Sequence, residues 1–318
     1  MCESKIQVNS FFNDCHFVAF LYVDLGADVE GGKKGLAHVT EHMLVSFDRG
    51  EESDYYVMAH TTNRYMVYEI LFDGESIGKE KIMSMLYRIM DGTSLSHQTL
   101  EKCKKEVLTE IEQEKDRFLW MKKWYGEEYE KYIPLGTEEV VKNLTKEDIE
   151  QFMQGYYLKA DKQVILVGED EKLPYKNISN PDWKGYSCEK APIYQYICED
   201  LLYLQMQKCE KANQDFGCQL HKIQGEYVIE QVVEHTDQWI RQQLCKEESF
   251  KEGFIQVCNI YQQCTEFDRD NLKQIAIDCI SRKQIPFQMK QVKEVLKEGN
   301  DKMWYFRFKD YIENLKIV

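Results

Sequence analysis

The sequence has few prolines and no long apolar run. Only 5 of its 318 residues are proline. The longest apolar runs, "FVAFLYVDLGA" and "VILVG", are too short to cross a membrane, and the N-terminus has neither the basic start and apolar stretch nor the cleavage site of a secretory signal. We therefore expect a cytoplasmic protein without a membrane segment.

The sequence also lacks an excess of basic residues and any pair of cysteines spaced C-x-x-C. A formal net charge of −14 disfavours binding to nucleic acid, which needs a basic surface, whereas a basic or extended peptide partner is compatible with it. The 11 cysteines, eight of them between Cys188 and Cys279, have the spacing neither of a disulfide framework nor of a thiolate metal site. We expect reduced thiols that behave as small buried apolar groups.

The apolar periodicity along the chain predicts an α+β fold. Strand patterns cover residues 11–25, 65–74 and 162–169, and helical patterns cover residues 35–47, 79–92, 96–125 and 144–157. In the last of these, Thr145 followed by Asp148 is typical of a capping box at a helix start. These elements have enough apolar residues for a core of their own and predict a first module over residues 1–170.

The rest of the chain predicts a linker and a second unit. Three of the five prolines lie within residues 171–192, which we interpret as the linker. Beyond it, residues 201–214 are helical in pattern, residues 217–234 are strand-like and residues 235–254 are helical again. We therefore expect a smaller α+β unit over residues 193–318.

The stretch "GLAHVTEHML", residues 35–44, carries the chemistry. On a helix His38 and His42 lie one turn apart and about 40° from one another, so both imidazoles can approach one ion, and Glu41 can reach a water molecule held by that ion. The competing interpretation is a core helix that happens to contain two histidines. A catalytic zinc also needs a third ligand, and spacing alone cannot select it from the acidic residues of the long helix: Glu101, Glu106, Glu110, Glu112 and Glu114.

Several stretches resemble the pitrilysin/insulinase family of zinc peptidases, the inverzincins, which includes mitochondrial processing peptidase. "GADVEGGKKGLAHVTEHML" is similar to the family's active-site region, and Ala59, Thr61 and Tyr68 match a strand pattern that follows it. "LEKCKKEVLTEI" is similar to the helix with the third ligand, and "PLGTEEVVKNLTKEDIEQFMQGYY" to the close of the module. The resemblance covers about residues 16 to 170.

The resemblance implies a function and a set of roles. It implies a zinc endopeptidase with a mixed or antiparallel sheet whose helices pack on one side, followed by a reduced second unit. His38, His42 and Glu110 would be the zinc ligands, and Glu41 the general base. The chain departs from the family in two respects: Cys103 replaces a glutamate seven positions before Glu110, which is expected to weaken support for the site, and residues 1–10 leave little room for the family's opening strand.

Residues beside a predicted strand bear on the substrate, and the resemblance bears on assembly. Arg64 and Tyr65, beside a predicted strand, would help position an extended peptide that pairs with the strand edge, or would simply pack against the strand. Family members close a chamber with a second, similar module, and this chain has no second H-x-x-E-H motif. His221 and His235 are isolated, and we expect structural roles for both. We therefore expect a dimer, and a heterodimer with a related subunit before a homodimer.

Two functions follow from these expectations. The first is a peptidase that matures a ribosomally made precursor peptide, by analogy with small bacterial relatives. The alternative is a non-catalytic scaffold or partner subunit, although such subunits usually lose the zinc residues. A metal-storage or redox function for the cysteines would require clustered thiolates.

Overall fold

The structure is a computed structural model, and its contacts divide the chain into two compact units, Met1–Lys184 and Gly185–Val318. It describes residues 7–11, 16–45, 55–73, 79–93, 97–114, 121–126, 129, 132–167, 190–213, 215–223, 226–233, 235–264, 269–284, 287 and 289–317. The predicted linker over residues 171–192 lies almost entirely outside the described residues, so the predicted boundaries of 1–170 and 193–318 stay predictions.

A five-stranded sheet forms the centre of the first unit. Its strand order is β1-β5-β2-β4-β3, with bounds Gln7–Phe11, Lys162–Val167, His16–Val23, Met66–Asp73 and Tyr55–Thr61. β1 pairs with β5 in parallel, and the remaining pairs are antiparallel. The expectation of a mixed, largely antiparallel sheet is confirmed.

The expectation that residues 1–10 leave little room for a strand is wrong. β1 begins at Gln7 and pairs with β5 from Gln7↔Gln163 to Phe11↔Val167. Five residues suffice, because a strand at a sheet edge needs one partner only. The strand predicted over residues 11–25 is shorter in the structure, where it is β2, His16–Val23.

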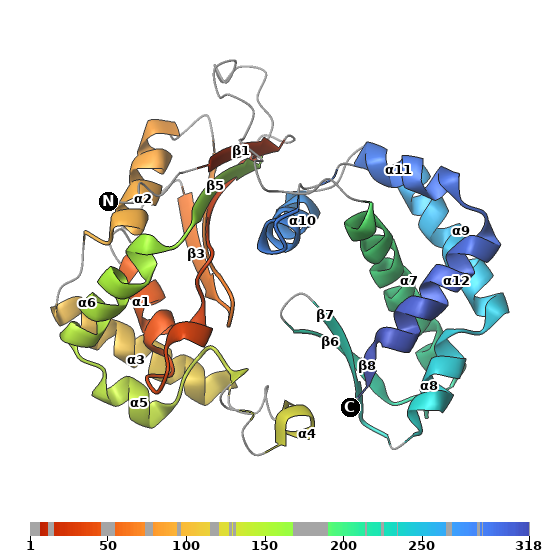
Figure 1. Cartoon of the computed structure of the whole chain (residues 1–318), viewed down its shortest axis with the longest axis horizontal. Helices are drawn as coiled ribbons and strands as arrows, with labels where there is room; N and C mark the ends of the chain where they lie inside the picture. Colours follow the sequence, from red (N-terminus) through yellow and green to blue (C-terminus); the bar gives the residue numbers. More distant parts are fainter. Residues whose placement is uncertain are drawn as a thin grey trace. The chain divides into compact units, whose positions relative to one another are not determined.

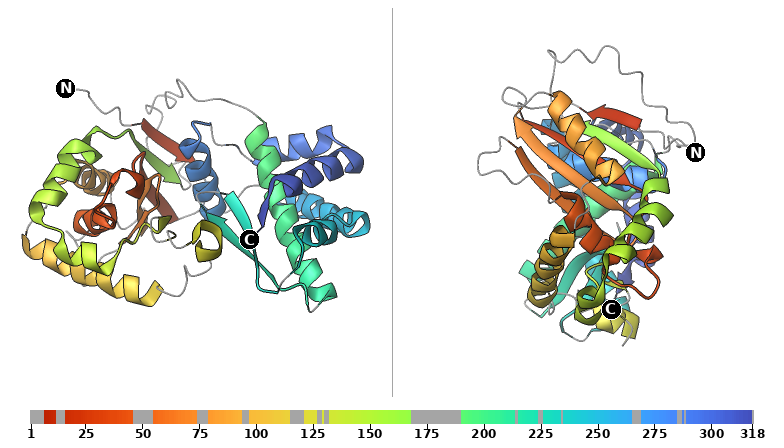
Figure 2. Two further views of the ribbon diagram at one scale, coloured as in Figure 1. Left: turned by 60° about the horizontal axis from the view of Figure 1, so that its bottom comes forward. Right: turned by 90° about the vertical axis from the view of Figure 1, so that its left-hand side faces the viewer.

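Helices of the first unit cover one face of this sheet (Figures 1 and 2). They are α1 (Leu36–Val45), α2 (Lys79–Asp91), α3 (His97–Glu114), α5 (Glu138–Asn143) and α6 (Lys146–Gly155). The short helix α4 (Met121–Tyr125) lies apart from this layer (Figure 1). The core lies between the two layers. It is formed by alternate residues of β2 and β4, such as Leu21, Tyr68 and Ile70, and by apolar helix faces that include Met43 and Val107. The α+β fold class is confirmed.

Local signals explain where these helices begin. Thr145 caps α6 through its side chain, which accepts the N–H of Asp148, and the Asp148 carboxylate accepts the N–H of Thr145, so the predicted capping box is present. Thr137 caps α5 in the same way, through Val140 N–H. The helix predicted over residues 96–125 is described as α3, to Glu114, and as α4, from Met121, and the residues between them lie outside the described parts of the chain.

The second unit is mostly helical. Its helices are α7 (Ala191–Ala212), α8 (Asp237–Leu244), α9 (Glu247–Gln263), α10 (Arg269–Ser281), α11 (Met289–Glu298) and α12 (Asp301–Asn314). The strands β6 (Cys218–Ile223), β7 (Glu226–Gln231) and β8 (Lys316–Ile317) form a second sheet in that order. α7 packs against α9, α11 and α12 around the buried aromatic side chains of Phe250, Trp304 and Phe308.

None of the helices that the structure describes combines the length and the apolar character needed to cross a membrane.

Candidate metal centre

A buried carboxylate fixes the start of α1, the helix that carries both histidines. Glu30 accepts the backbone N–H of Gly35 at 3.0 Å and that of Ala37 at 2.6 Å. Gly35 has φ +96°, and a Cβ there would lie 2.9 Å from the carbonyl oxygen of Leu135, so only glycine fits. Burial raises the pKa of Glu30 to about 7, although these two hydrogen bonds and the charge of Lys34 oppose the shift.

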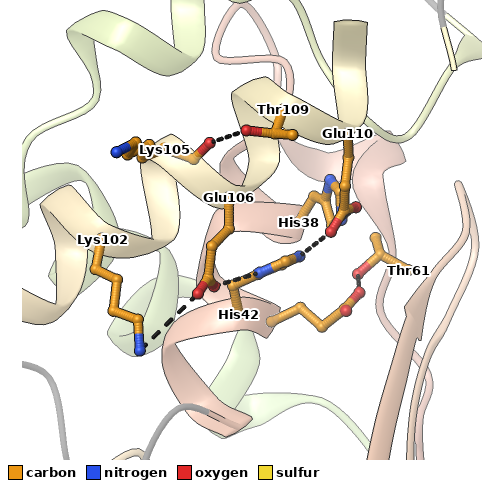
Figure 3. A network of polar contacts seen from close by, with 9 residues as sticks. His38, His42, Thr61, Lys102, Lys105, Glu106, Thr109 and Glu110 are labelled. Atoms are coloured by element: carbon orange, nitrogen blue, oxygen red, sulfur yellow. Dashed lines mark hydrogen bonds and ion pairs between the residues drawn. The ribbon is translucent and has the colours of Figure 1, made fainter. Parts of the chain in front are cut away.

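His38 and His42 point from α1 toward the same carboxylate on α3. His38 Nε2 lies 3.2 Å from Glu110 Oε2, and His42 Nε2 lies 3.2 Å from Glu110 Oε1 (Figure 3). The ring centroids are 4.9 Å apart. α3 packs directly against α1, and this contact brings Glu110 to residues some seventy positions earlier in the chain.

These three side chains fit a zinc ion. With zinc–nitrogen and zinc–oxygen bonds of about 2.0 to 2.1 Å, two ligand atoms of a tetrahedral site lie about 3.3 Å apart. The two distances from imidazole nitrogen to carboxylate oxygen are both 3.2 Å. The donors are two imidazoles and one carboxylate, a set found in catalytic zinc sites. His38 is buried and His42 is mostly buried, so the ligand atoms are held by the packing of α1.

Glu41 lies beside the same two imidazoles. Ligand atoms of His38, Glu41 and His42 all lie within 4.8 Å of one another. Among the described residues, Glu110 is the carboxylate that contacts the Nε2 atoms of both histidines. The Glu41 carboxylate instead accepts a hydrogen bond from the hydroxyl of Thr61, the last residue of β3. We therefore assign Glu110 as the third ligand candidate and Glu41 as the candidate base.

The contacts shift the pKa values of two of these groups in opposite directions. Hydrogen bonds from His38 and His42 hold the pKa of Glu110 well below its usual range. Burial lowers the pKa of His42, but the nearby carboxylates of Glu110, Glu41 and Glu106 outweigh it, so the pKa is raised. Three carboxylates, those of Glu41, Glu106 and Glu110, thus lie beside the imidazoles, and their negative charge favours a cation.

Sequence reasoning missed two residues of this site. Thr61 matched a family strand pattern, but no spacing rule predicted its hydrogen bond to Glu41. Glu106 was one of five undistinguished glutamates, and its Oε2 lies 3.2 Å from His42 Nδ1. The available signal was its position four residues before Glu110, which places both carboxylates on one helix face. Cys103, which replaces the glutamate that the resembled family has seven positions before the third ligand, is buried in the core.

Arg64 and Tyr65 lie in the turn between β3 and β4. The Thr62 hydroxyl accepts the backbone N–H of both residues, and Thr62 N–H donates to the carbonyl oxygen of Tyr65. The Arg64 side chain is exposed, and the Tyr65 ring packs 5.4 Å from that of Tyr22. The structure thus places both residues at the end of the edge strand, and their role stays a prediction.

The histidines of the second unit make structural contacts. His221 Nε2 lies 3.0 Å from Glu230 on the neighbouring strand. His235 stacks on Trp239 with ring centroids 4.0 Å apart, and its Nε2 lies 2.6 Å from the carbonyl oxygen of Asp215. Among the described residues, neither histidine belongs to a cluster that could hold a metal ion.

Similarity to known proteins is visible in structure only. No protein-family model matches the sequence, and no curated protein matches it either. The periplasmic protease PqqL from Escherichia coli aligns at a TM-score of 0.69 and 11% identity, over 99% of this chain and 47% of that chain. A putative M16-like peptidase from Alicyclobacillus acidocaldarius aligns at 0.66 and 15% identity, over 97% and 93%.

A peptidase M16 inactive domain from Pseudomonas fluorescens also aligns, at a TM-score of 0.66 and 11% identity, over 97% of this chain and 93% of that chain. The fold is that of these peptidase modules. At such low identity the likeness establishes the fold alone, and this fold carries both peptidases and an inactive domain. The chain spans about half of the PqqL protease and nearly all of the two shorter chains.

Proposed function

We propose that this protein is a zinc-dependent endopeptidase of the pitrilysin/insulinase type, or the catalytic subunit of one. The observation that carries the proposal is the convergence of His38 Nε2 and His42 Nε2 on the Glu110 carboxylate, with Glu41 beside them. His38, His42 and Glu110 would hold the ion. Zinc bound there would polarise the scissile carbonyl and lower the pKa of a water molecule toward neutrality.

The proton transfers are assigned to Glu41. Its carboxylate accepts the proton of the attacking water and then delivers that proton to the leaving amine, so the amide is hydrolysed without a covalent intermediate. Thr61 donates to Glu41 Oε2 and thereby fixes the direction of the carboxylate. The hydroxyl leaves the second oxygen, Oε1, for the water.

An extended peptide is the substrate that best fits the surroundings of the site. Among the described residues β3 pairs only with β4, and it ends at Thr61 against Glu41. A peptide added along β3 by main-chain hydrogen bonds would pass the candidate base, with alternate side chains meeting the exposed Tyr56 and Met58. Arg64 and Tyr65, at the end of this strand, would contact the same peptide.

The test is a comparison of the wild type with Glu41→Gln on a mixture of unstructured peptides, followed by mass spectrometry. We expect Glu41→Gln to bind zinc like the wild type and to lose peptidase activity by at least about 100-fold, because the proton acceptor is gone. A Glu41→Gln protein that is fully loaded with zinc and fully active would refute the assigned base. The same comparison tests candidate precursor peptides, which we propose as substrates by analogy only.

A scaffold or partner subunit is the second candidate function. It is favoured by the M16 inactive domain of Pseudomonas fluorescens, which has this fold over 93% of its chain. The two candidates differ in metal content. A catalytic chain binds about one zinc ion, whereas a scaffold subunit binds none at the His38 cluster.

We also propose that the chain works with a partner, a related subunit or a second copy of itself. The support is its length, since it spans 47% of the PqqL protease, another structure of which is described as its first half. We expect the purified chain to gain activity on adding a related subunit, or to be dimeric by mass photometry. A fully active monomer would contradict this proposal.

We place the protein in the cytoplasm. The seven described cysteines of the second unit are free thiols, which a reducing compartment preserves. PqqL itself is described as periplasmic, so this assignment belongs to the present chain and not to the fold.

A further inference from the structure

The two imidazoles of the cluster are held unequally. His42 has a contact at each ring nitrogen: Nε2 lies 3.2 Å from Glu110 Oε1, and Nδ1 lies 3.2 Å from Glu106 Oε2. His38 contacts Glu110 through Nε2, and its buried Nδ1 has no hydrogen-bond partner in the part of the chain that the structure describes. The difference is due to Glu106 (Figure 3).

Glu106 is well placed to hold the His42 ring. It precedes Glu110 by four residues on α3, so the two carboxylates lie one helical turn apart on the same face and meet opposite nitrogens of one imidazole. The Glu106 side chain is 30% exposed, and its other oxygen lies 3.9 Å from the Lys102 ammonium. The carboxylate therefore lies between the ring and a cation.

We propose that Glu106 is a positioning residue for the metal centre. It accepts the N–H of His42 Nδ1, which fixes the ring plane and selects the ring tautomer whose Nε2 lone pair would bind an ion held between His42 and Glu110. A carboxylate at this position also makes the imidazole a more basic ligand. The inference rests on the proposed function for the identity of the metal, and on the contacts of this chain for the role of Glu106.

Two other roles for Glu106 do not fit the geometry. As a fourth metal ligand it would have to reach the Nε2 side of His42, but it meets the ring at Nδ1, on the other side. As a solvated surface residue it would have no contact with the ring. Cys103, which replaces the second glutamate of the resembled family, is fully buried in the core. The carboxylate that reaches His42 from the turn of α3 before Glu110 is therefore that of Glu106.

The first test measures zinc affinity on the full chain by competition with a chromophoric chelator. We expect Glu106→Ala to weaken zinc binding about 10- to 100-fold, as the loss of a hydrogen-bond partner of a metal ligand does elsewhere, and Glu106→Gln to weaken it less, because the amide oxygen still accepts the N–H. Glu112→Ala is the matched control. It removes the same charge from an exposed position of α3, and we expect a change of no more than about twofold.

The second test follows the His42 ring proton by NMR in the zinc-loaded protein. A hydrogen-bonded Nδ1–H of His42 should give a downfield signal that exchanges slowly with water in the wild type and in Glu112→Ala. The signal should be lost in Glu106→Ala. Circular dichroism and the unfolding midpoint of each variant show whether it is folded, and neither of these measurements reports on the ring proton.

The outcomes separate this inference from the proposed function. If the wild type binds zinc and Glu106→Ala binds it equally tightly with an unchanged ring proton, Glu106 is not a positioning residue and the zinc site stands. If the wild type itself binds no zinc, the proposed function fails, and the role of Glu106 fails with it.

Discussion

The two units of the chain differ sharply in the polar groups that they bury. Ten of the eleven buried polar or charged residues in the described parts of the chain belong to the first unit; they are Glu30, His38, Thr40, Glu41, Thr61, Asn63, Glu69, Lys104, Lys162 and Gln163. The described residues of the second unit contribute Gln205 alone. Because burial of a polar group costs free energy unless the group is paired, each of these side chains needs a hydrogen-bond or ion-pair partner within the fold.

The second unit instead buries apolar rings and thiols. Four of its seven described cysteines are buried, which agrees with the expectation of buried thiols, and burial raises the pKa of Cys198 to about 12 and that of Cys209 to about 11. Thiols with such pKa values are poor nucleophiles and poor metal ligands at neutral pH. The comparison teaches that the candidate metal site belongs to the unit that buries more polar side chains, and three substitutions test this division between the site and the packing of the second unit.

The largest effect is expected for the core of the second unit. Phe308 on α12 is fully buried, and its ring packs 5.6 Å from that of Phe250. We expect Phe308→Ala to lower the free energy of unfolding by about 3 to 5 kcal/mol, because it leaves a cavity, and to leave zinc affinity unchanged. Urea unfolding and chelator competition measure the two quantities. Weaker zinc binding in a folded Phe308→Ala protein would show that the division between the units is wrong.

For Glu110 we expect the opposite pattern, a large loss of zinc affinity with little change in stability. Its side chain is 40% exposed and lies at the end of α3, so it contributes little to the core. We expect Glu110→Ala to weaken zinc binding by at least about 100-fold, through loss of a ligand, while the free energy of unfolding of the metal-free chain changes by less than about 1 kcal/mol. Unchanged zinc affinity would remove Glu110 from the ligand set. Glu112→Ala again serves as the control on the same helix.

The smallest effect concerns Glu30, which caps α1 from the loop before it. Burial raises its pKa from 4.5 to about 7, against the opposing charges of Lys34 and His38. An acid whose pKa is raised on folding stabilises the fold below pH 4.5 and loses that contribution as the pH rises through 7. We therefore expect the free energy of unfolding of the metal-free wild type, relative to Glu30→Gln, to fall by about 1 to 3 kcal/mol over this range.

Chemical unfolding of the two proteins at several pH values measures this difference. A difference that stays flat, or that rises with pH, would mean that Glu30 is ionised at no cost in the folded chain. In that case the buried Glu30 carboxylate would make the stability of the first unit no more dependent on pH than the apolar contacts of the second unit make theirs.

Local patterns were enough to predict most of the first unit. The 3.6-residue period of α1, the capping box of α6 and the alternation of β4 are all set by residues close in sequence. β1 could not be predicted this way. Its five residues become a strand by pairing with β5, more than 150 positions away, and no local pattern contains that partner.

The same distinction applies to the site. The spacing of His38, Glu41 and His42 predicted their common face, because one helical turn fixes it. The choice of Glu110 came from a family resemblance, since the rotation of α3 against α1 decides which glutamate reaches the imidazoles. Glu106 and Thr61 depend on the packing of α3 and β3 against α1, and no spacing within the sequence encodes that packing.

The most direct test of the account is the zinc content of the purified full chain. After incubation with zinc and removal of the excess, we predict about one zinc ion per chain in the wild type and almost none in a His38→Ala/His42→Ala double variant that remains folded. A folded wild type that retains no zinc, or a double variant that retains as much zinc as the wild type, would contradict the claim that α1 and α3 form a zinc site.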